Sequence, residues 1–191
     1  KLAKIEGQQP ELVIITGLSG SGKGTVLKCL EDLGYYSVDN LPIQLIEKFA
    51  QLKHDSPAVR RAALVVDIRE GDALRQFPAI FELVKKKVPT RLVFLEADDE
   101  VIVRRFSETR RPHPLGTERS VTRSVHKERE LLSALRLMAD LVINPSKFNV
   151  HELRATMGEQ FRGARAESKA LGYVPGVGIG NGVPGASALA L

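Results

Sequence analysis

The stretch that decides the fold runs from Glu11 to Thr25 and has the sequence ELVIITGLSGSGKGT. Its first part, Glu11–Thr16, is a short and mostly apolar run, which is typical of a strand buried within a parallel sheet. A glycine-rich turn follows, and the pattern of Thr25–Leu33 predicts a helix. A strand, a glycine-rich turn and a helix in this order are the context of a loop that binds phosphate groups.

The turn has the residue types that phosphate binding requires. A phosphate chain must lie against backbone N–H groups, so side chains must be absent and the backbone must turn freely, as glycine allows. The helix points its positive N-terminus at the same place, and Lys23 is a candidate for both binding and catalysis at the terminal phosphates. A turn without a ligand is the alternative. The predicted nucleotide-binding residues are Gly17, Leu18, Ser19, Gly20, Ser21, Gly22, Lys23, Gly24 and Thr25.

The end of this loop departs from the usual pattern. Such loops commonly end in Lys-Ser or Lys-Thr, and the hydroxyl group holds Mg²⁺. Here Gly24 takes that place and Thr25 comes one residue later. A Lys-Gly-Thr ending is similar to adenylate-kinase-like sequences, so the variant is compatible with nucleotide binding. Thr25 is the candidate metal ligand, and direct ligation stays open.

Apolar runs and helical segments alternate along the rest of the chain. This alternation predicts a doubly wound parallel sheet, a P-loop NTPase/kinase-like α/β fold with three layers, α/β/α. In such sheets, ligands bind at the carboxyl ends of the strands. The predicted strands are Tyr35–Val38, Ala62–Ile68, Arg91–Glu96 and Leu141–Asn144. The predicted helices are Pro42–Leu52, Asp72–Lys87, Asp98–Thr109 and Asn149–Phe161, the last with Asn149 as its cap.

The composition divides the chain into three parts. Residues 1–10 are an N-terminal segment, and residues 11–161 are the predicted P-loop nucleotide-binding domain. Residues 162–191 form a Gly/Pro-rich tail, because residues 170–191 carry no charge and hold six glycines and two prolines. This end has neither helical nor strand periodicity.

Polar residues follow two of the predicted strands. Asp67 ends an apolar run, where an acid can hold Mg²⁺ directly or through water, so it is a catalytic and metal-binding candidate; the alternative is a cap for the next segment. Asp39 and Asn40 follow the second strand, where kinases of this fold bind an acceptor. Asp39 could act there as a base, or it could close a turn before Pro42.

A basic, proline-broken stretch follows the predicted helix Asp98–Thr109. Arginine forks fit phosphate oxygens with two bonds at once, and a mobile lid would bring Arg110 or Arg111 onto a transferring phosphate. Both are catalytic candidates, and a solvated basic helix face with a loop is the alternative. His113 lies between two prolines, so we expect it to be exposed and assign it no catalytic role.

Charge and composition limit the classes of function. The net charge is +5, and residues 104–129 hold eight Arg or Lys against three Glu. Such a patch suits the phosphates of a nucleotide or of RNA. Aromatic residues make up 5% and Trp is absent, which leaves little for base stacking, and one cysteine excludes an internal disulfide. The apolar runs are too short to span a bilayer, so we expect no membrane span and a cytoplasmic location.

Four blocks of the sequence, in order, resemble one family. GLSGSGKG, CLEDLGYYSVDNLP, VVDIRE and RRFSETRRPHPL are similar to RapZ-type bacterial nucleotide-binding proteins, also called RNase adapter proteins, over about residues 11–161. The resemblance implies ATP and GTP binding with hydrolysis of both. It assigns ATP to Gly17–Gly24 and GTP to Asp67, Ile68, Arg69 and Glu70. In some members it also implies RNA binding, linked to a C-terminal domain that we expect this chain to lack.

Three hypotheses follow from these observations. The first is a regulatory nucleotide-binding protein with slow ATPase and GTPase activity, for which the family's usual Lys-Ser ending makes Gly24 a departure that could weaken hydrolysis. The second is a small-molecule or nucleotide kinase that uses Asp39 and the arginine lid. The third is a non-enzymatic module that binds RNA or a protein through its basic segment. The sequence leaves the ATP or GTP preference and the oligomeric state open.

Overall fold

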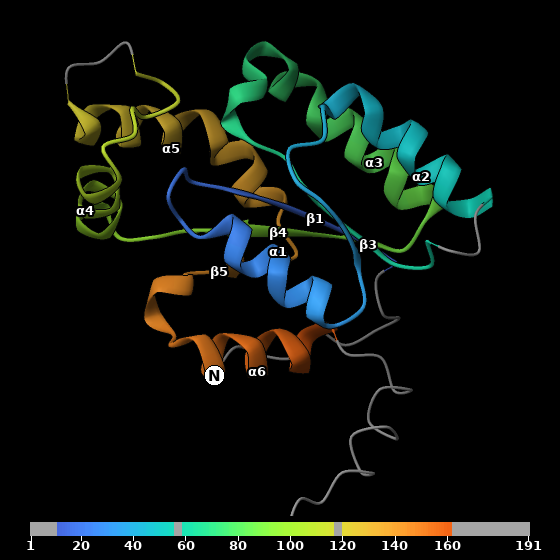
Figure 1. Ribbon diagram of the computed structural model, residues 1–191. Helices are drawn as coiled ribbons and strands as arrows, with labels where there is room; N and C mark the ends of the chain where they lie inside the picture. The colour runs from blue at the N-terminus through green and yellow to red at the C-terminus, as the bar shows by residue number, and fades with distance from the viewer. Residues whose placement is uncertain (1–10, 56–58, 117–119, 162–191) are drawn as a thin grey trace, which may run out of the picture.

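The computed structural model describes residues 11–55, 59–116 and 120–161 of the 191. The predicted N-terminal segment and the Gly/Pro-rich tail lie outside these ranges. Within them, the chain forms one parallel sheet with strand order β2-β3-β1-β4-β5 (Figure 1), which confirms the predicted doubly wound α/β class. The strands are β1 (Leu12–Gly17), β2 (Tyr36–Val38), β3 (Ala62–Val65), β4 (Thr90–Leu95) and β5 (Leu141–Ile143).

The register brings the carboxyl ends of the strands to one edge of the sheet. β1 lies in the centre and is buried along its whole length. Ile15 pairs with Val65 on one side and with Val93 on the other. The loops that leave β1, β2 and β3 therefore meet at this edge, where ligands of such sheets bind.

Helices cover both faces of the sheet and complete the three predicted layers (Figure 1). Alternate β1 residues point to opposite faces: Leu12 and Ile14 belong to one apolar cluster, and Val13 and Ile15 to the other. α1 (Lys23–Asp32) and α6 (Val150–Phe161) supply the cluster with Val13. The other face is covered by α2 (Ile46–Asp55), α3 (Phe77–Lys87), α4 (Asp99–Thr109) and α5 (Val121–Met138).

Several element boundaries differ from the prediction. β3 ends at Val65, because the chain turns at Asp67 into a 3-10 segment, Ile68–Gln76, before α3 begins at Phe77. A short 3-10 turn, Ile43–Leu45, likewise precedes α2. The start of α6 was predicted correctly: Asn149 Oδ1 accepts from the Glu152 N–H at 2.9 Å, and the Glu152 carboxylate accepts from the Asn149 N–H at 2.9 Å.

The longest helix within the described ranges, α5, was missed by the sequence prediction. Its buried positions include Ser124 and Glu128 beside Val125, Leu132 and Leu135. Two polar residues on the inward side interrupt the apolar period from which an amphipathic helix is recognised. Among the described residues, no helix is both long and apolar enough to cross a membrane.

Candidate functional site

The predicted phosphate loop joins the end of β1 to the start of α1. Gly17 has φ 132°, and a Cβ built on it would lie 2.1 Å from the Leu95 carbonyl oxygen. Gly22 has φ 103° and caps α1 in the left-handed region. The first glycine thus lets the loop leave the sheet against β4, and the last glycine turns the chain into the helix.

Several donors of the loop are free to bind an anion. Within the described ranges, the backbone N–H groups of Gly20, Gly22, Lys23 and Gly24 have no acceptor. The Ser21 hydroxyl is fully buried and also lacks a hydrogen-bond partner among the described residues. Unpaired donors at the positive end of a helix are the arrangement in which proteins bind phosphate. The residues therefore fit the phosphates of a nucleotide.

Lys23 lies at the centre of this arrangement. Its ammonium group donates to the carbonyl oxygens of Gly17 at 2.8 Å and Leu18 at 3.2 Å. It also lies 3.4 Å from Asp67 Oδ2, and both side chains are buried. A buried cation with a carboxylate partner at the strand edge is held in place before any ligand arrives.

Asp67 has the capping role that the sequence offered as its alternative, and it also forms two ion pairs. It caps the 3-10 segment by accepting from the Arg69 N–H at 3.2 Å, and it pairs with Lys23 and with the Arg69 guanidinium. Burial raises the pKa of the Asp67 carboxyl, but Lys23 and the bonds from Arg69 outweigh it and hold the pKa below its usual range. Asp67 is thus an anion fixed beside the lysine.

Replacing Asp67 with asparagine is expected to lower stability more at neutral pH than in acid. The pKa of Asp67 is lower in the folded protein than in the unfolded chain. The stability that the ionised carboxylate contributes is therefore present above the ordinary carboxyl pKa, and it is lost as the pH falls through the pKa of the folded protein. We expect a loss of about 1–3 kcal/mol at pH 7, where Lys23 loses its partner. The loss should shrink near pH 3. Urea denaturation at both pH values measures it.

The matched control for this variant is Asp72→Asn, because the Asp72 side chain is 96% exposed and pairs only loosely with Arg75 at 3.7 Å. That variant should change stability by less than about 0.5 kcal/mol at either pH. An Asp67→Asn protein whose deficit is equal at pH 7 and pH 3 would contradict the assigned ion pair.

Gly24 and Thr25 lie on the exposed side of the first turn of α1. A Cβ built on Gly24 would meet nothing within 4 Å. Packing therefore does not require glycine at this position, and a serine or threonine side chain would fit. Among the described residues, no cluster of three or more His, Cys, Asp or Glu could hold a metal ion.

The other predicted strand-end residues follow β2, and the chain just after them bonds to the end of β3 and to the 3-10 segment. The Leu41 N–H donates to the Val65 carbonyl at 3.1 Å, and the Ile43 N–H donates to the Glu70 carboxylate at 3.3 Å. Asp39 and Asn40 are exposed at this edge, and Asn40 adopts a left-handed turn conformation with φ 55°. The residue with the turn conformation before Pro42 is therefore Asn40 rather than Asp39, and Asp39 is exposed to solvent.

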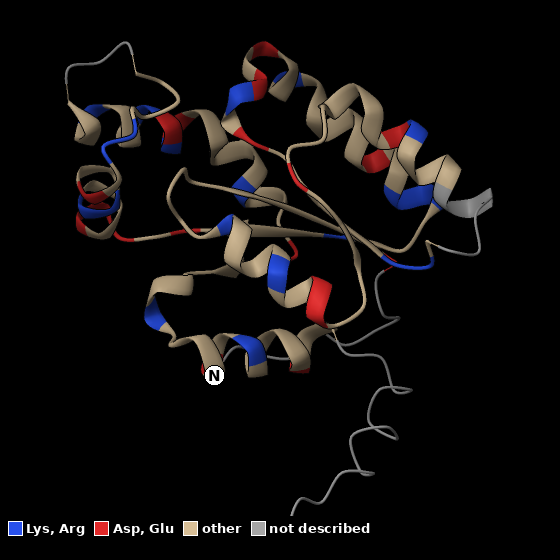
Figure 2. Cartoon of the chain, viewed as in Figure 1, with Lys and Arg blue, Asp and Glu red and all other residues tan. Residues whose placement is uncertain are grey.

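The candidate arginines are exposed at the end of α4. Arg110 has φ 51° and ends the helix, and within the described ranges neither Arg110 nor Arg111 has a hydrogen bond or ion pair. Arg105, one turn earlier, donates to the Gly20 carbonyl at 2.6 Å, and the Phe106 ring lies 3.4 Å from a Cβ built on Gly20. Figure 2 shows basic positions along α4, the loop after it and α5. α4 therefore touches the phosphate loop directly.

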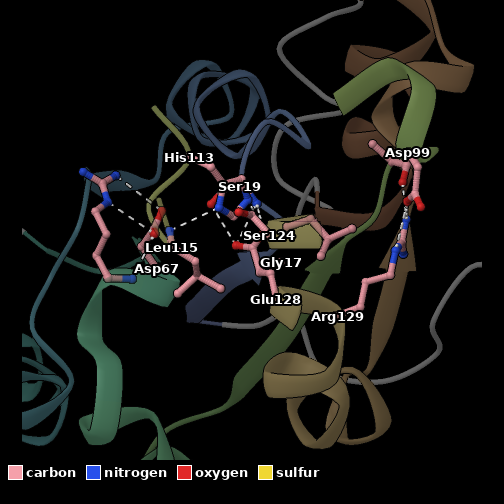
Figure 3. Close-up of polar contacts among 12 residues, drawn as sticks. Gly17, Ser19, Asp67, Asp99, His113, Leu115, Ser124, Glu128 and Arg129 are labelled. Carbon is pink, nitrogen blue, oxygen red and sulfur yellow. Dashed lines mark hydrogen bonds and ion pairs between the residues drawn. The ribbon is translucent and has the colours of Figure 1, made fainter. Parts of the chain in front are cut away.

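The expectation that His113 is exposed was wrong. His113 is 5% exposed, and its Nε2 lies 3.2 Å from the buried carboxylate of Glu128. Its flanking prolines are exposed while the ring turns inward against Phe106. Sequence analysis missed Glu128 altogether, and its position in a basic, polar stretch gave no signal of burial. Figure 3 shows the two side chains beside Ser19.

The fold and the loop together define a class of protein. A parallel sheet with a glycine-rich loop, a buried lysine and free helix-end donors is a P-loop α/β/α domain of the kinase-like type. The chain belongs to the family described as the RapZ-like N-terminal domain, whose model matches residues 10–165. This finding confirms the resemblance drawn from the four sequence blocks.

Curated relatives of this chain are named as nucleotide-binding proteins. A nucleotide-binding protein of Solibacter usitatus is 64% identical over 92% of this chain, and one of Koribacter versatilis is 55% identical over 93%. The chain covers 55% and 58% of these relatives, so it spans a little more than half of their length. The family is thus one of nucleotide-binding proteins with a kinase-like P-loop fold.

Solved structures share the fold at low sequence identity. The YorR protein of Bacillus subtilis, in complex with phosphorylated GDP, has a TM-score of 0.54 at 15% identity and covers 85% of this chain and 99% of its own. A sugar kinase from Janibacter has a TM-score of 0.55 at 18% identity and covers 82% of this chain and 97% of its own. These similarities support the architecture.

Proposed function

We propose that this chain binds ATP and GTP with Mg²⁺ and hydrolyses them slowly as part of a regulatory protein. The observation that carries the proposal is the set of unpaired donors in the phosphate loop: four backbone N–H groups and the Ser21 hydroxyl. Lys23 adds a positive charge at the same loop. The family is one of nucleotide-binding proteins, and the related fold of YorR holds a guanine nucleotide.

Each part of the site would have a defined role. The free N–H groups at the start of α1 would bind the phosphate oxygens, and Lys23 would neutralise the terminal phosphate. Asp67 and Thr25 would hold Mg²⁺, which supplies charge neutralisation on the phosphate oxygens when bound. Arg110 and Arg111 would turn onto the transferring phosphate, because their exposed side chains have no hydrogen bond or ion pair within the described ranges. Ile68, Arg69 and Glu70 would contribute the GTP-assigned segment.

The proposal is tested by titration calorimetry of ATP and GTP on this chain, with and without Mg²⁺, followed by an assay of phosphate release. We expect both nucleotides to bind more tightly with Mg²⁺ and phosphate to appear slowly without any acceptor. If neither ATP nor GTP binds, the result contradicts the proposed nucleotide site. Binding without phosphate release would leave a nucleotide sensor and remove the hydrolase role.

A kinase is the second candidate, because Asp39 is exposed at the strand edge where kinases of this fold bind an acceptor. A kinase should transfer phosphate to an added acceptor and show little hydrolysis in its absence. The basic residues of α4 and α5 would carry RNA binding in the third candidate, and that binding should fall steeply with salt. RNA binding should also survive the loss of Lys23, unlike nucleotide binding.

Replacing Gly24 with serine is expected to strengthen Mg²⁺-dependent nucleotide binding severalfold. The new Cβ has open space around it, and the hydroxyl would stand where such loops usually hold the metal. Gly24→Ala is the matched control, since it adds the same Cβ without the hydroxyl. Calorimetry with and without Mg²⁺ compares the two. Equal behaviour of the serine and alanine variants would show that position 24 does not reach the metal.

A further inference from the structure

The buried carboxylate of Glu128 joins three parts of the molecule. Glu128 lies on α5 with 0% exposure. It contacts Ser19 in the phosphate loop and His113 in residues 110–116, which we name the arginine loop because they begin with Arg110 and Arg111 (Figure 3). Moving a charged group out of water is unfavourable unless donors replace the water. The donors around Glu128 therefore show which segments of the chain the carboxylate connects.

Ser19 offers two of these donors. Its backbone N–H lies 3.0 Å from both carboxylate oxygens of Glu128, and its hydroxyl donates to Oε1 at 2.8 Å. Ser19 follows Gly17 and Leu18, whose carbonyl oxygens accept from the Lys23 ammonium. The carboxylate thus fixes the first half of the phosphate loop next to the lysine that would meet the terminal phosphate.

His113 supplies the third donor, and its tautomer follows from its other contact. The Leu115 N–H donates to His113 Nδ1 at 3.1 Å, so Nδ1 is an acceptor without a proton. The ring proton of the neutral imidazole is then on Nε2, which donates to Glu128 Oε2 at 3.2 Å. The Leu115 N–H and the imidazole thus form a chain of hydrogen bonds that ends at the Glu128 carboxylate, which accepts from Ser19 on its other side.

We propose that Glu128 is a positioning residue that holds the arginine loop against the phosphate loop, with His113 as the connecting group. His113 follows Arg111 by two residues, so fixing the ring limits where the two arginines can lie. A catalytic effect of this linkage rests on the proposed function. The linkage itself concerns only contacts of this chain.

A Glu128→Gln variant separates the two ends of this linkage. The amide oxygen of glutamine still accepts from Ser19, but the amide NH₂ then faces Nε2–H of His113, and two donors cannot bond. If the ring shifts its proton to Nδ1, that proton faces the Leu115 N–H instead. The variant therefore keeps the two bonds from Ser19 to Oε1, loses the shared contact of the Ser19 N–H with Oε2, and breaks the chain on the side of the arginine loop.

The test combines NMR spectroscopy with nucleotide binding on the full chain. In the parent we expect the ¹⁵N shifts of His113 to report a proton on Nε2 and none on Nδ1. In Glu128→Gln the Leu115 amide should exchange about tenfold faster or more, as expected when a buried hydrogen bond is lost. The Ser19 amide should keep its protection, and ADP affinity should change less than about twofold.

Two further variants serve as a control and as a safeguard against misfolding. Ser19→Ala removes one bond to Glu128 but keeps the backbone donor, so the Leu115 amide should exchange as in the parent. His113→Ala breaks the linkage from the arginine loop without changing α5, and it should raise exchange in residues 113–116 while Ser19 stays protected. If Glu128→Gln fails to fold, this second variant decides the question.

The outcomes for the linkage are independent of hydrolysis. Unchanged exchange at Leu115 in both Glu128→Gln and His113→Ala, or a proton on Nδ1 in the parent, would overturn the proposal. If the parent releases phosphate, Glu128→Gln should lower the rate about tenfold with little change in KM, because only the arginines are displaced. A rate unchanged while exchange rises would overturn the positioning role. A parent that releases no phosphate counts against the proposed function alone.

Discussion

Replacing Lys23 with alanine should weaken ATP and GTP binding about tenfold or more, which corresponds to about 1.4 kcal/mol for a charge-assisted phosphate contact. Lys23 is the buried cation of the phosphate loop, held by the carbonyl oxygens of Gly17 and Leu18 and by Asp67. The variant removes that charge from the place where the terminal phosphate would lie. Titration calorimetry measures the change.

The matched control is Lys28→Ala, because Lys28 is an exposed lysine on the same helix. Its loss changes the net charge equally and should alter nucleotide affinity by less than about twofold. Urea denaturation of each variant separates a lost contact from lost folding. Equal affinities for the parent and the Lys23→Ala protein would remove the basis for the phosphate-loop assignment, whereas equal losses in both variants would indicate a general charge effect.

Replacing Gly17 with alanine should destabilise the fold by about 3 kcal/mol or more, because the added Cβ cannot be accommodated without moving the backbone. Its ideal position lies 2.1 Å from the Leu95 carbonyl oxygen and 2.5 Å from the Leu95 nitrogen, and φ is 132°. Both contacts are with the backbone of β4, which is fixed in the centre of the sheet. Urea or thermal denaturation measures the loss.

Gly24→Ala provides the comparison for this prediction, because a Cβ there meets nothing within 4 Å and the residue lies in the first turn of α1. We expect that variant to equal or exceed the parent in stability, by up to about 1 kcal/mol. A Gly17→Ala protein within about 1 kcal/mol of the parent would show that β1 and β4 separate at this point more easily than the packing indicates.

The sequence was sufficient to predict the fold class, because the fold class follows from local patterns of apolar residues and glycines. The apolar runs Glu11–Thr16 and Arg91–Glu96 are typical of buried strands, and a glycine-rich turn between a strand and a helix is typical of a phosphate loop. Fold class and family were therefore predicted correctly. The strand order was not predicted, because it depends on pairings between distant segments that no local pattern records.

The surroundings of the loop could not be predicted for a similar reason. Glu128 lies 109 positions after Ser19 in the sequence, and the carboxylate is buried only because donors from two other segments converge on it. Because Glu128 is a polar residue on the buried side of α5, the apolar periodicity was interrupted and the helix was not recognised from the sequence. His113 was expected to be exposed because prolines flank it, but the prolines turn outward and leave the ring inside. Such positions are set by tertiary contacts.

The two shortest strands of the sheet are its edges. β2 and β5 each have three residues, whereas β1 and β4 have six. An exposed strand edge can recruit another chain and start aggregation, and short edge strands are one way in which proteins limit this. Among the described residues, the sheet thus offers little backbone for strand addition. If copies of this chain assemble, we expect helical surfaces to form the interface.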